Sequence, residues 1–451
     1  MRVVLRQAIV LAALFLAGRT SAAGLPLRYN LTVGSRLHYG STSESKYARS
    51  ARGEVRLTEV WVVGENLDQS WRLVLRRTST AYRVDSAGTR TDGEPQTEWA
   101  RCDLAADGKA TGVSSTGALD PSQLFPPLPV DGDGMEQAWE RFDVKNAERT
   151  RYRFEPGPGD SIRFIRADYE TPLDSVYLTS SHAVFQFNTR RSLIVRKESE
   201  TEQNWGPSSG KTGAVTTLNS VTRLDTTQAR EFDRELAVFF VADSAYGALL
   251  DRASENPAQK QVLLDSAQAV MDSGRARVTD STVLTMFDDE VGTLEEIALQ
   301  MDKDAAWRDS LVGHPAPAWS LPGLDGKKHS LKDYRGKLVI LDFWYRGCPW
   351  CIRAMPQLNE LAQKYQGKPV AVIGMNTDKD TADARFVVNK LRLGYTNVLA
   401  RGEDKKYRVQ GFPTHYVIDA KGVVRDIHVG YSPDLGVKLA ATVEKLLAGK
   451  K

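Results

Sequence analysis

The chain has 451 residues, which is enough for two or three domains. Its 60 basic and 57 acidic residues leave a net charge of only +3, so we expect no nucleic-acid partner. With 41% hydrophobic and 26% charged residues the composition is that of an ordinary globular protein, and three cysteines are too few for a disulfide scaffold.

Residues 1–23 have the pattern of a secretory signal peptide. A basic start at Arg2 and Arg6 precedes a short apolar run over 8–17, and small residues at 20–23 offer a cleavage point. The apolar run is too short to cross ~30 Å of hydrocarbon, and no other stretch of the sequence is long enough. We therefore expect an exported protein, periplasmic or extracellular, without a stable membrane span.

Residues 24–225 are expected to form a β-rich domain of unknown function. Apolar residues alternate with arginines and other polar residues, as in Val55, Leu57, Trp61 and Val63. Turn signals such as Pro156-Gly157-Pro158-Gly159 separate such segments. The pattern predicts an antiparallel sandwich, a curved sheet or an open barrel, in which one face of each sheet is exposed to solvent. No catalytic constellation is visible in this region.

In residues 226–310 the hydrophobic residues recur with the period of a helix, and this segment is expected to form a helical connector. Phe232, Leu236, Phe239 and Phe240 fall on one helix face. Asn256-Pro257 predicts the start of a second helix, and another is expected to begin at Thr293.

The remaining segment, 311–451, contains the feature with the clearest chemistry. The apolar strand 338–344 leads into Cys348-Pro349-Trp350-Cys351, two cysteines three apart at the expected start of a helix. The helix dipole and the free backbone N–H groups at that end favour a thiolate on the first cysteine. The pair therefore predicts thiol–disulfide exchange, although half of a zinc site has the same spacing.

Zinc and other metals are not expected. A zinc site needs about four ligands, and the sequence supplies neither a second cysteine pair nor histidines at ligand spacing. The third cysteine, Cys102, is expected to be a buried small residue, with pairing to another molecule as the alternative. The six histidines are scattered singly, at His38, His182, His314, His329, His415 and His428.

From Val312 onward the sequence resembles the thioredoxin superfamily, specifically its exported TlpA- and ResA-like thiol–disulfide oxidoreductases. The resemblance covers under a third of the chain and rests on motifs in the family's order. These are the hairpin Gly313–Lys327, the strand and cysteine pair, Pro356 within the helix, the strand Val370–Gly374, the insertion Lys379–Arg408, Gly411-Phe412-Pro413-Thr414, and the closing hairpin Tyr416–Arg425. The whole chain is then multidomain, with a C-terminal α/β thioredoxin-like fold.

The resemblance implies a role for each site residue. Cys348 is the expected nucleophile, exposed at the helix start, and Cys351 is the expected resolving thiol, which together form a redox-active disulfide. Pro413 is expected to be cis. Trp350, Phe412 and Thr414 are the expected substrate-binding residues.

Asp342, six residues before Cys348, stands where cytosolic thioredoxins carry a buried aspartate. There it can accept the proton of the deeper thiol, and a structural role at a strand end is the alternative. The chain departs from its relatives at Gly347, where thioredoxins often have Trp, and at Ala354, where ResA-like proteins place Glu. The pair Pro349-Trp350 is unusual too, so the direction of electron flow stays open.

The predicted function is an exported enzyme that exchanges disulfides with protein substrates, without a bound cofactor. Its partners would be protein thiols and disulfides, with a membrane thiol electron donor if it works as a reductase, since no nicotinamide or flavin fingerprint is present. One alternative is a peroxiredoxin-like thiol peroxidase, against which Leu341 and Tyr345 argue, because those enzymes carry Pro and Thr or Ser there. The other is a non-enzymatic binding protein with an accessory redox domain.

Overall fold

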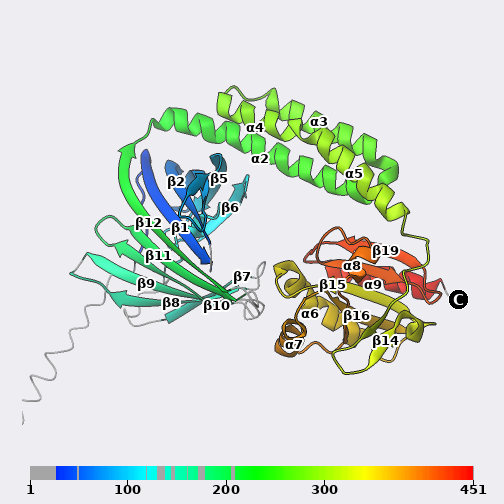
Figure 1. Ribbon diagram of the computed structural model, residues 1–451. Coiled ribbons are helices and arrows are strands. Elements are labelled where there is room, and N and C mark those ends of the chain that lie inside the picture. Colours follow the sequence, from blue (N-terminus) through cyan, green and yellow to red (C-terminus); the bar gives the residue numbers. More distant parts are fainter. Residues whose placement is uncertain are drawn as a thin grey trace, which may run out of the picture. The chain divides into compact units, whose positions relative to one another are not determined.

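A computed structural model describes residues 27–47, 50–117, 119–128, 138–143, 148–159, 161–170, 178–204 and 209–449. The predicted signal peptide lies outside these residues. The described chain divides into two compact units, and Figure 1 shows their elements. The first contains the described residues of Met1–Glu170, Ser181–Thr201 and Thr212–Asp233, and the second contains the others.

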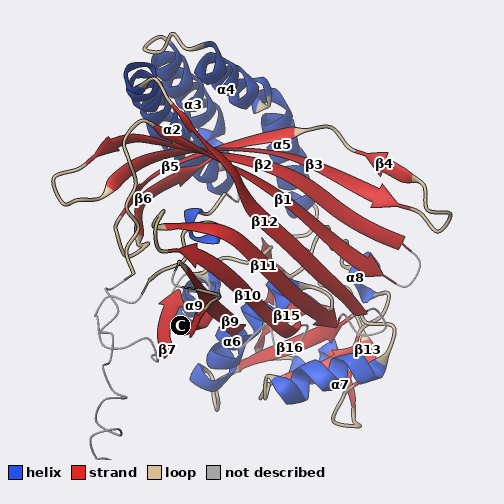
Figure 2. Cartoon of the chain, turned by 90° about the vertical axis from the view of Figure 1, so that its left-hand side faces the viewer, coloured by secondary structure: helices blue, strands red, loops and turns tan. Residues whose placement is uncertain are grey.

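The first unit is built on one antiparallel sheet of twelve strands, which Figure 2 shows to be strongly curved. The strand order is β6-β5-β3-β2-β1-β12-β11-β10-β9-β8-β7, with β4 paired to β3, so the first and last long strands are neighbours. A curved open sheet is therefore formed, and not a sandwich of two sheets. The strands are β1 (Ser35–Tyr47), β2 (Ser50–Glu65), β3 (Trp71–Val84), β4 (Arg90–Asp92), β5 (Gln96–Leu104), β6 (Ala110–Ser115), β7 (Ala138–Asp143), β8 (Glu148–Pro156), β9 (Ile162–Glu170), β10 (Leu178–Asn188), β11 (Leu193–Asn204) and β12 (Ser209–Arg223).

The alternation of the sequence fills one face of this sheet with the core of the unit. Leu73 and Leu75 on β3 and Tyr39 on β1 are buried there, and Tyr29 packs edge-on against the rings of Phe125 and Phe187. Side chains of period two point to the same face of a strand, which is why the polar residues between them face away.

The helical middle consists of α2 (Thr226–Glu255), α3 (Lys260–Arg275), α4 (Ser281–Gly292) and α5 (Leu294–Asp309). Pro257 begins a short 3₁₀ turn, Pro257–Gln259, that leads into α3. The start of α2 belongs to the first unit, because Phe232 packs on Trp61 and Trp99 and Asp233 accepts a hydrogen bond from Arg101 at 3.1 Å. No helix within the described part of the chain is both long and apolar enough to cross a membrane.

The C-terminal sheet has the order β17-β16-β15-β18-β19. β15, β16 and β17 are parallel, and β18 pairs antiparallel with both β15 and β19. Every residue of the central strand β15 is buried, since helices or loops cover both faces. This arrangement confirms the expected thioredoxin-like α/β fold. The elements are β13 (Ser320–Pro322), β14 (Lys328–Ser330), the 3₁₀ turn Leu331–Tyr334, β15 (Leu338–Trp344), α6 (Pro349–Lys364), β16 (Val370–Asn376), α7 (Thr381–Lys390), β17 (Thr396–Leu399), α8 (Glu403–Lys406), β18 (Thr414–Ile418), β19 (Val424–Val429) and α9 (Leu435–Ala448).

The last turn of α5 is part of this C-terminal core, although the sequence places it in the connector. Trp307 is buried among residues of β15, β16 and β18, and its indole N–H donates to the Arg408 carbonyl at 3.0 Å. Arg308 reaches the Asp426 carboxylate at 2.9 Å and the Ile427 carbonyl. The redox domain therefore uses residues that precede its expected start at residue 311.

Asp426 on β19 joins this turn of α5 to α9, and we expect it to stabilise the domain at neutral pH. Its carboxylate accepts from Arg308 and from the Thr442 hydroxyl at 3.1 Å, and lies 3.0 Å from His428 Nε2. Burial acts to raise the pKa of Asp426, but the contacts with His428, the Ile427 backbone N–H and Arg308 together outweigh it and lower the pKa to about 2.

An aspartate with a lowered pKa stabilises the fold above its unfolded pKa of ~4, and this contribution is lost as pH falls toward 2. We expect Asp426→Asn to cost about 2 kcal/mol in the free energy of unfolding at pH 7. Urea unfolding of both proteins from pH 7 to pH 2 checks this. A difference that does not shrink at low pH would contradict the role of the charge.

Candidate functional site

The two cysteines of the predicted site form a disulfide at the N-terminus of α6. Cys348 is the N-cap residue, with its Sγ accepting the backbone N–H of Cys351 at 3.1 Å, and Pro349 occupies the first helical position. Proline is suited to that position because its missing N–H would have no partner there. The strand–helix junction thus places both sulfurs beside the free N–H groups of the helix.

The sequence analysis expected an exposed Cys348, but the structure shows it buried. It is only 3% exposed, and Cys351 is 1% exposed, because both pack in a cluster with Trp344, Ile352 and Met355. A substrate that reaches the Cys348 sulfur must therefore come close to the surrounding side chains.

The loop before β18 lies against this disulfide. The Phe412–Pro413 peptide bond is cis, as the resemblance implied, and Phe412 packs on the cluster that contains both cysteines. The Pro413 carbonyl accepts the N–H of Gly430 at 2.8 Å. Thr414 is fully buried, and its hydroxyl donates to the Gly411 carbonyl at 2.6 Å, so its side chain is engaged within the loop.

Aromatic side chains surround the disulfide at the surface. Trp350 is 52% exposed and stacks on Tyr431 with ring centroids 5.7 Å apart, and the Arg353 guanidinium lies 5.0 Å from the Trp350 ring. Tyr345 packs edge-on against Phe412 at 5.1 Å. The sequence analysis missed Tyr431, which stands in no motif and is brought here only by the fold, and it used Tyr345 only as an argument against a peroxidase.

Asp342 lies on β15 and is 1% exposed. Its Oδ1 is 3.3 Å from Nε2 of the fully buried His415, and its Oδ2 accepts from the Tyr395 hydroxyl at 3.4 Å. The sequence analysis treated His415 as one of six scattered histidines. Its partnership with Asp342 follows from the register of β15 with β18, which no sequence motif reveals.

The segment before Cys348 is held by a carboxylate that lies just after the end of β16. The backbone N–H of Arg346 donates to Asp378 at 2.9 Å, the Asn376 amide donates to the same carboxylate at 2.7 Å, and the Arg346 guanidinium pairs with Asp383 on α7 at 2.7 Å. These contacts fix the residue that precedes Gly347 and Cys348. Burial is the main cause of a raised pKa for the Asp378 carboxyl.

We expect Asp378→Ala to destabilise the domain by about 2 kcal/mol, because the buried N–H of Arg346 and the Asn376 amide lose their acceptor. Asp378→Asn keeps an acceptor and should cost less. Since the folded state holds this proton more tightly than the unfolded state, the contribution of the wild-type group is largest below pH ~4 and shrinks as pH rises. Urea unfolding at pH 4 and pH 7 tests both statements, and equal losses in the two variants would rule out the acceptor role.

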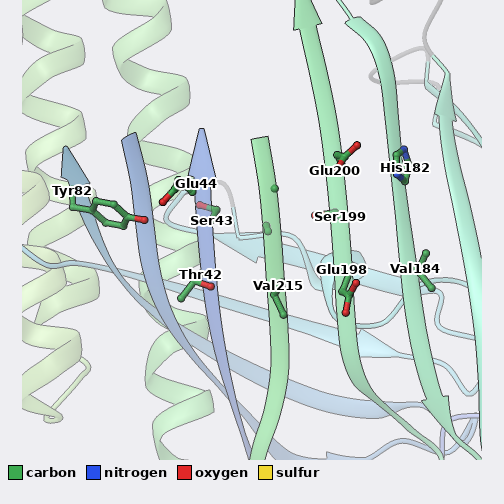
Figure 3. Close-up of a pocket in the computed structure, with 12 residues that line it drawn as sticks. Thr42, Ser43, Glu44, Tyr82, His182, Val184, Glu198, Ser199, Glu200 and Val215 are labelled. Carbon is green, nitrogen blue, oxygen red and sulfur yellow. The ribbon is translucent and has the colours of Figure 1, made fainter. Parts of the chain in front are cut away.

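The first unit has a separate hollow of about 380 Å³, shown in Figure 3. Its acidic side chains already have partners: Glu198 pairs with Arg196 at 2.7 Å and Glu44 with Lys46 at 3.2 Å. Within the described residues, no group of three or more His, Cys, Asp or Glu side chains could hold a metal ion. The hollow is lined by Thr42, Ser43, Glu44, Tyr82, His182, Val184, Glu198, Ser199, Glu200, Gly213, Ala214 and Val215.

Cys102 lies in the core of the first unit, whereas the disulfide belongs to the second. It is 2% exposed, and burial raises the pKa of its thiol to about 12. A thiol that is not ionised is a poor nucleophile, so this residue fits the expectation of a buried apolar side chain.

A helix-capping disulfide beside a cis-proline loop, on this mixed sheet, defines a thioredoxin-like redox domain. A model of the AhpC/TSA family matches residues 312–427. Thioredoxin-like protein YneN of Bacillus subtilis is 37% identical over 122 residues, which are 26% of this chain and 71% of that protein. Thiol-disulfide oxidoreductase ResA of Geobacillus thermodenitrificans is 36% identical over 121 residues, 26% of this chain and 70% of that protein.

Among solved structures, the thioredoxin domain of a thiol-disulfide oxidoreductase from Bacteroides vulgatus is 28% identical, with a TM-score of 0.27 over 29% of this chain and 97% of that one. Through its C-terminal domain the chain belongs to the AhpC/TSA family, and it is a thioredoxin-like thiol–disulfide oxidoreductase. The non-enzymatic alternative is therefore set aside.

Proposed function

We propose that this protein exchanges disulfides with protein substrates through Cys348 and Cys351. The observation that carries the proposal is the disulfide at the N-terminus of α6, packed against the loop of Phe412 and Pro413. A thiolate at that position is favoured by the helix dipole and by the backbone N–H of Cys351, which already donates to the Cys348 sulfur.

The exchange moves two electrons in two substitution steps. In the reducing direction, the Cys348 thiolate attacks a substrate disulfide, forms a mixed disulfide and releases one substrate thiolate. Cys351 then loses its proton and attacks Cys348, which forms the Cys348–Cys351 disulfide and releases the second substrate thiolate. The oxidising direction runs the same steps backwards.

Substrate contact would come from the exposed aromatic side chains around the disulfide. Trp350 is half-exposed and close to Cys348 in the chain, and Phe412 packs on the cluster that contains both cysteines, so an extended protein segment that carries a cysteine can contact both rings while its backbone approaches the loop. Thr414 would act through the loop conformation, since its hydroxyl is bonded to Gly411.

Export and a membrane partner are also part of the proposal. The pattern of residues 1–23 supports secretion, where protein disulfides are common targets. Without a nicotinamide or flavin fingerprint, a reductase would take its electrons from a membrane thiol donor. The peroxidase alternative has no supporting observation, since Leu341 is buried in the core and the Tyr345 ring packs on Phe412.

The reduction potential of the Cys348–Cys351 couple tests the proposal. The protein is equilibrated in defined thiol buffers, and the two forms are separated by alkylation of free thiols, with Cys102→Ser to remove the third cysteine. A value near −270 mV indicates a reductant, and a value near −120 mV indicates an oxidant. If no reversible two-electron transition is found, the proposed function is wrong.

A further inference from the structure

Asp342 and His415 form a buried polar pair, and their contacts do not account for their presence in the core. Both side chains are at most 1% exposed, and they face each other across the register pair of β15 and β18. Asp342 Oδ1 and His415 Nε2 lie 3.3 Å apart, but neither of them, nor His415 Nδ1, makes an aligned hydrogen bond with any residue that the structure describes. Buried polar atoms without such bonds are costly, which suggests use in another state of the protein.

The pair lies on the face of the sheet that α6 covers. On β15, Ile340 packs with Ala354 and Leu358 of α6, and Trp344 packs with Cys351 and Met355. Asp342 stands between these two residues, and side chains of a strand alternate, so its carboxyl points to the first turns of α6. That stretch contains Cys351, which is buried, and Arg353, whose guanidinium lies 5.0 Å from the half-exposed Trp350 ring.

The other elements around the pair supply few groups that can exchange a proton. β16 places Gly374 opposite Asp342, and α9 contributes Leu435 and Leu439. On β19, His428 is the register partner of His415, but it lies 3.0 Å from Asp426.

Beside β17, Tyr395 donates to the second oxygen of Asp342. Burial and the nearby carboxylate raise the pKa of Tyr395 far above its usual value, so it remains a donor at any working pH.

We propose that His415 is a positioning residue for the resolving step, in which it shares with Asp342 the proton that Cys351 gives up. The inference rests on the proposed function. When Cys351 attacks the mixed disulfide, its proton passes to the Asp342 carboxylate. The proton can then lie on the His415 imidazole, so that the pair as a whole is neutral and the buried carboxylate is no longer an isolated negative charge. The new bond is Cys348–Cys351, the broken bond is that to the substrate, and the departing substrate thiolate takes a proton from solvent.

His415→Gln tests this role. Glutamine fills a similar space and can donate to Asp342, but it cannot take up a proton. A carboxylate with an imidazole binds a proton more tightly than one with an amide, because either group can hold it. We therefore expect the variant to resolve the mixed disulfide roughly tenfold more slowly at pH 8.5, with the inflection of the pH profile about one unit lower.

The measurement is stopped-flow release of a peptide thiol from the full-length protein, from pH 5.5 to pH 9. His428→Gln, on the partner strand, is the matched control and should keep the wild-type profile. Asp342→Asn should lose the inflection. A wild-type profile in His415→Gln overturns the inference alone, whereas absence of exchange in the wild type at every pH overturns the proposed function with it.

A second measurement avoids substitution at position 415. The imidazole resonances of histidine-labelled wild-type protein are followed by NMR against pH in the disulfide and dithiol forms. We expect the titration of His415 to differ between the two forms, since only the dithiol form has a Cys351 proton to share. Identical titration in both forms would overturn the inference.

Discussion

Cys348→Ser is expected to lower the rate of thiol–disulfide exchange at least about 10³-fold, because a serine hydroxyl is not ionised near pH 7 and cannot form the mixed disulfide. Cys351→Ser should behave differently. Its Cys348 thiolate still attacks the substrate, but nothing resolves the product, so a covalent complex with the substrate accumulates. The rate is measured with a protein disulfide as substrate, and the complex is detected on a non-reducing gel.

Cys102→Ser is the matched control for both variants. Its thiol is buried in the other unit with a pKa raised to about 12, so it should contribute nothing to exchange, and the variant should keep the wild-type rate. If Cys102→Ser loses as much activity as Cys348→Ser, or if Cys348→Ser remains active, the assignment of the redox centre to the cysteine pair fails.

Trp307→Ala is expected to lower the free energy of unfolding of the C-terminal domain by about 3–5 kcal/mol. The indole is buried in the domain core, and its removal also leaves the Arg408 carbonyl without its donor. For the same reason a shortened chain that starts at Leu311 should be less stable than one that starts at Leu294. Denaturant unfolding of the two shortened chains and of the variant measures these differences.

Leu299→Ala is the control within the same helix. Leu299 is 54% exposed, so its loss should change the free energy of unfolding by no more than about 0.5 kcal/mol. Equal stability of the chains that start at Leu294 and Leu311 would show that α5 does not support the redox domain.

Strong local patterns explain why the class of the fold could be predicted. Seven consecutive buried residues make up β15, and such an apolar run followed by a cysteine pair and Pro349 specifies a strand, a junction and a helix start. The alternation in β3 likewise follows from the pleat of a strand with one covered face. These are local properties, and each is written in a short stretch of sequence.

Contacts between distant segments could not be predicted in this way. The partnership of His415 with Asp342 depends on the register of β15 with β18, which joins residues 73 positions apart. The stacking of Tyr431 on Trp350 and the burial of Trp307 depend on how loops and helices close over the sheet. The near-complete burial of Cys348 has the same origin.

By itself, the sequence predicted thiol–disulfide exchange at Cys348 and Cys351, because their spacing at a helix start requires no distant partner. It also determined the order of a β-rich region, helices and an α/β domain, since hydrophobic period is a local property. Only the tertiary structure decided that the long strands form one curved sheet, and which side chains surround the sulfurs. Those outcomes depend on packing between segments far apart in the chain, and packing selects among the arrangements that a local pattern allows.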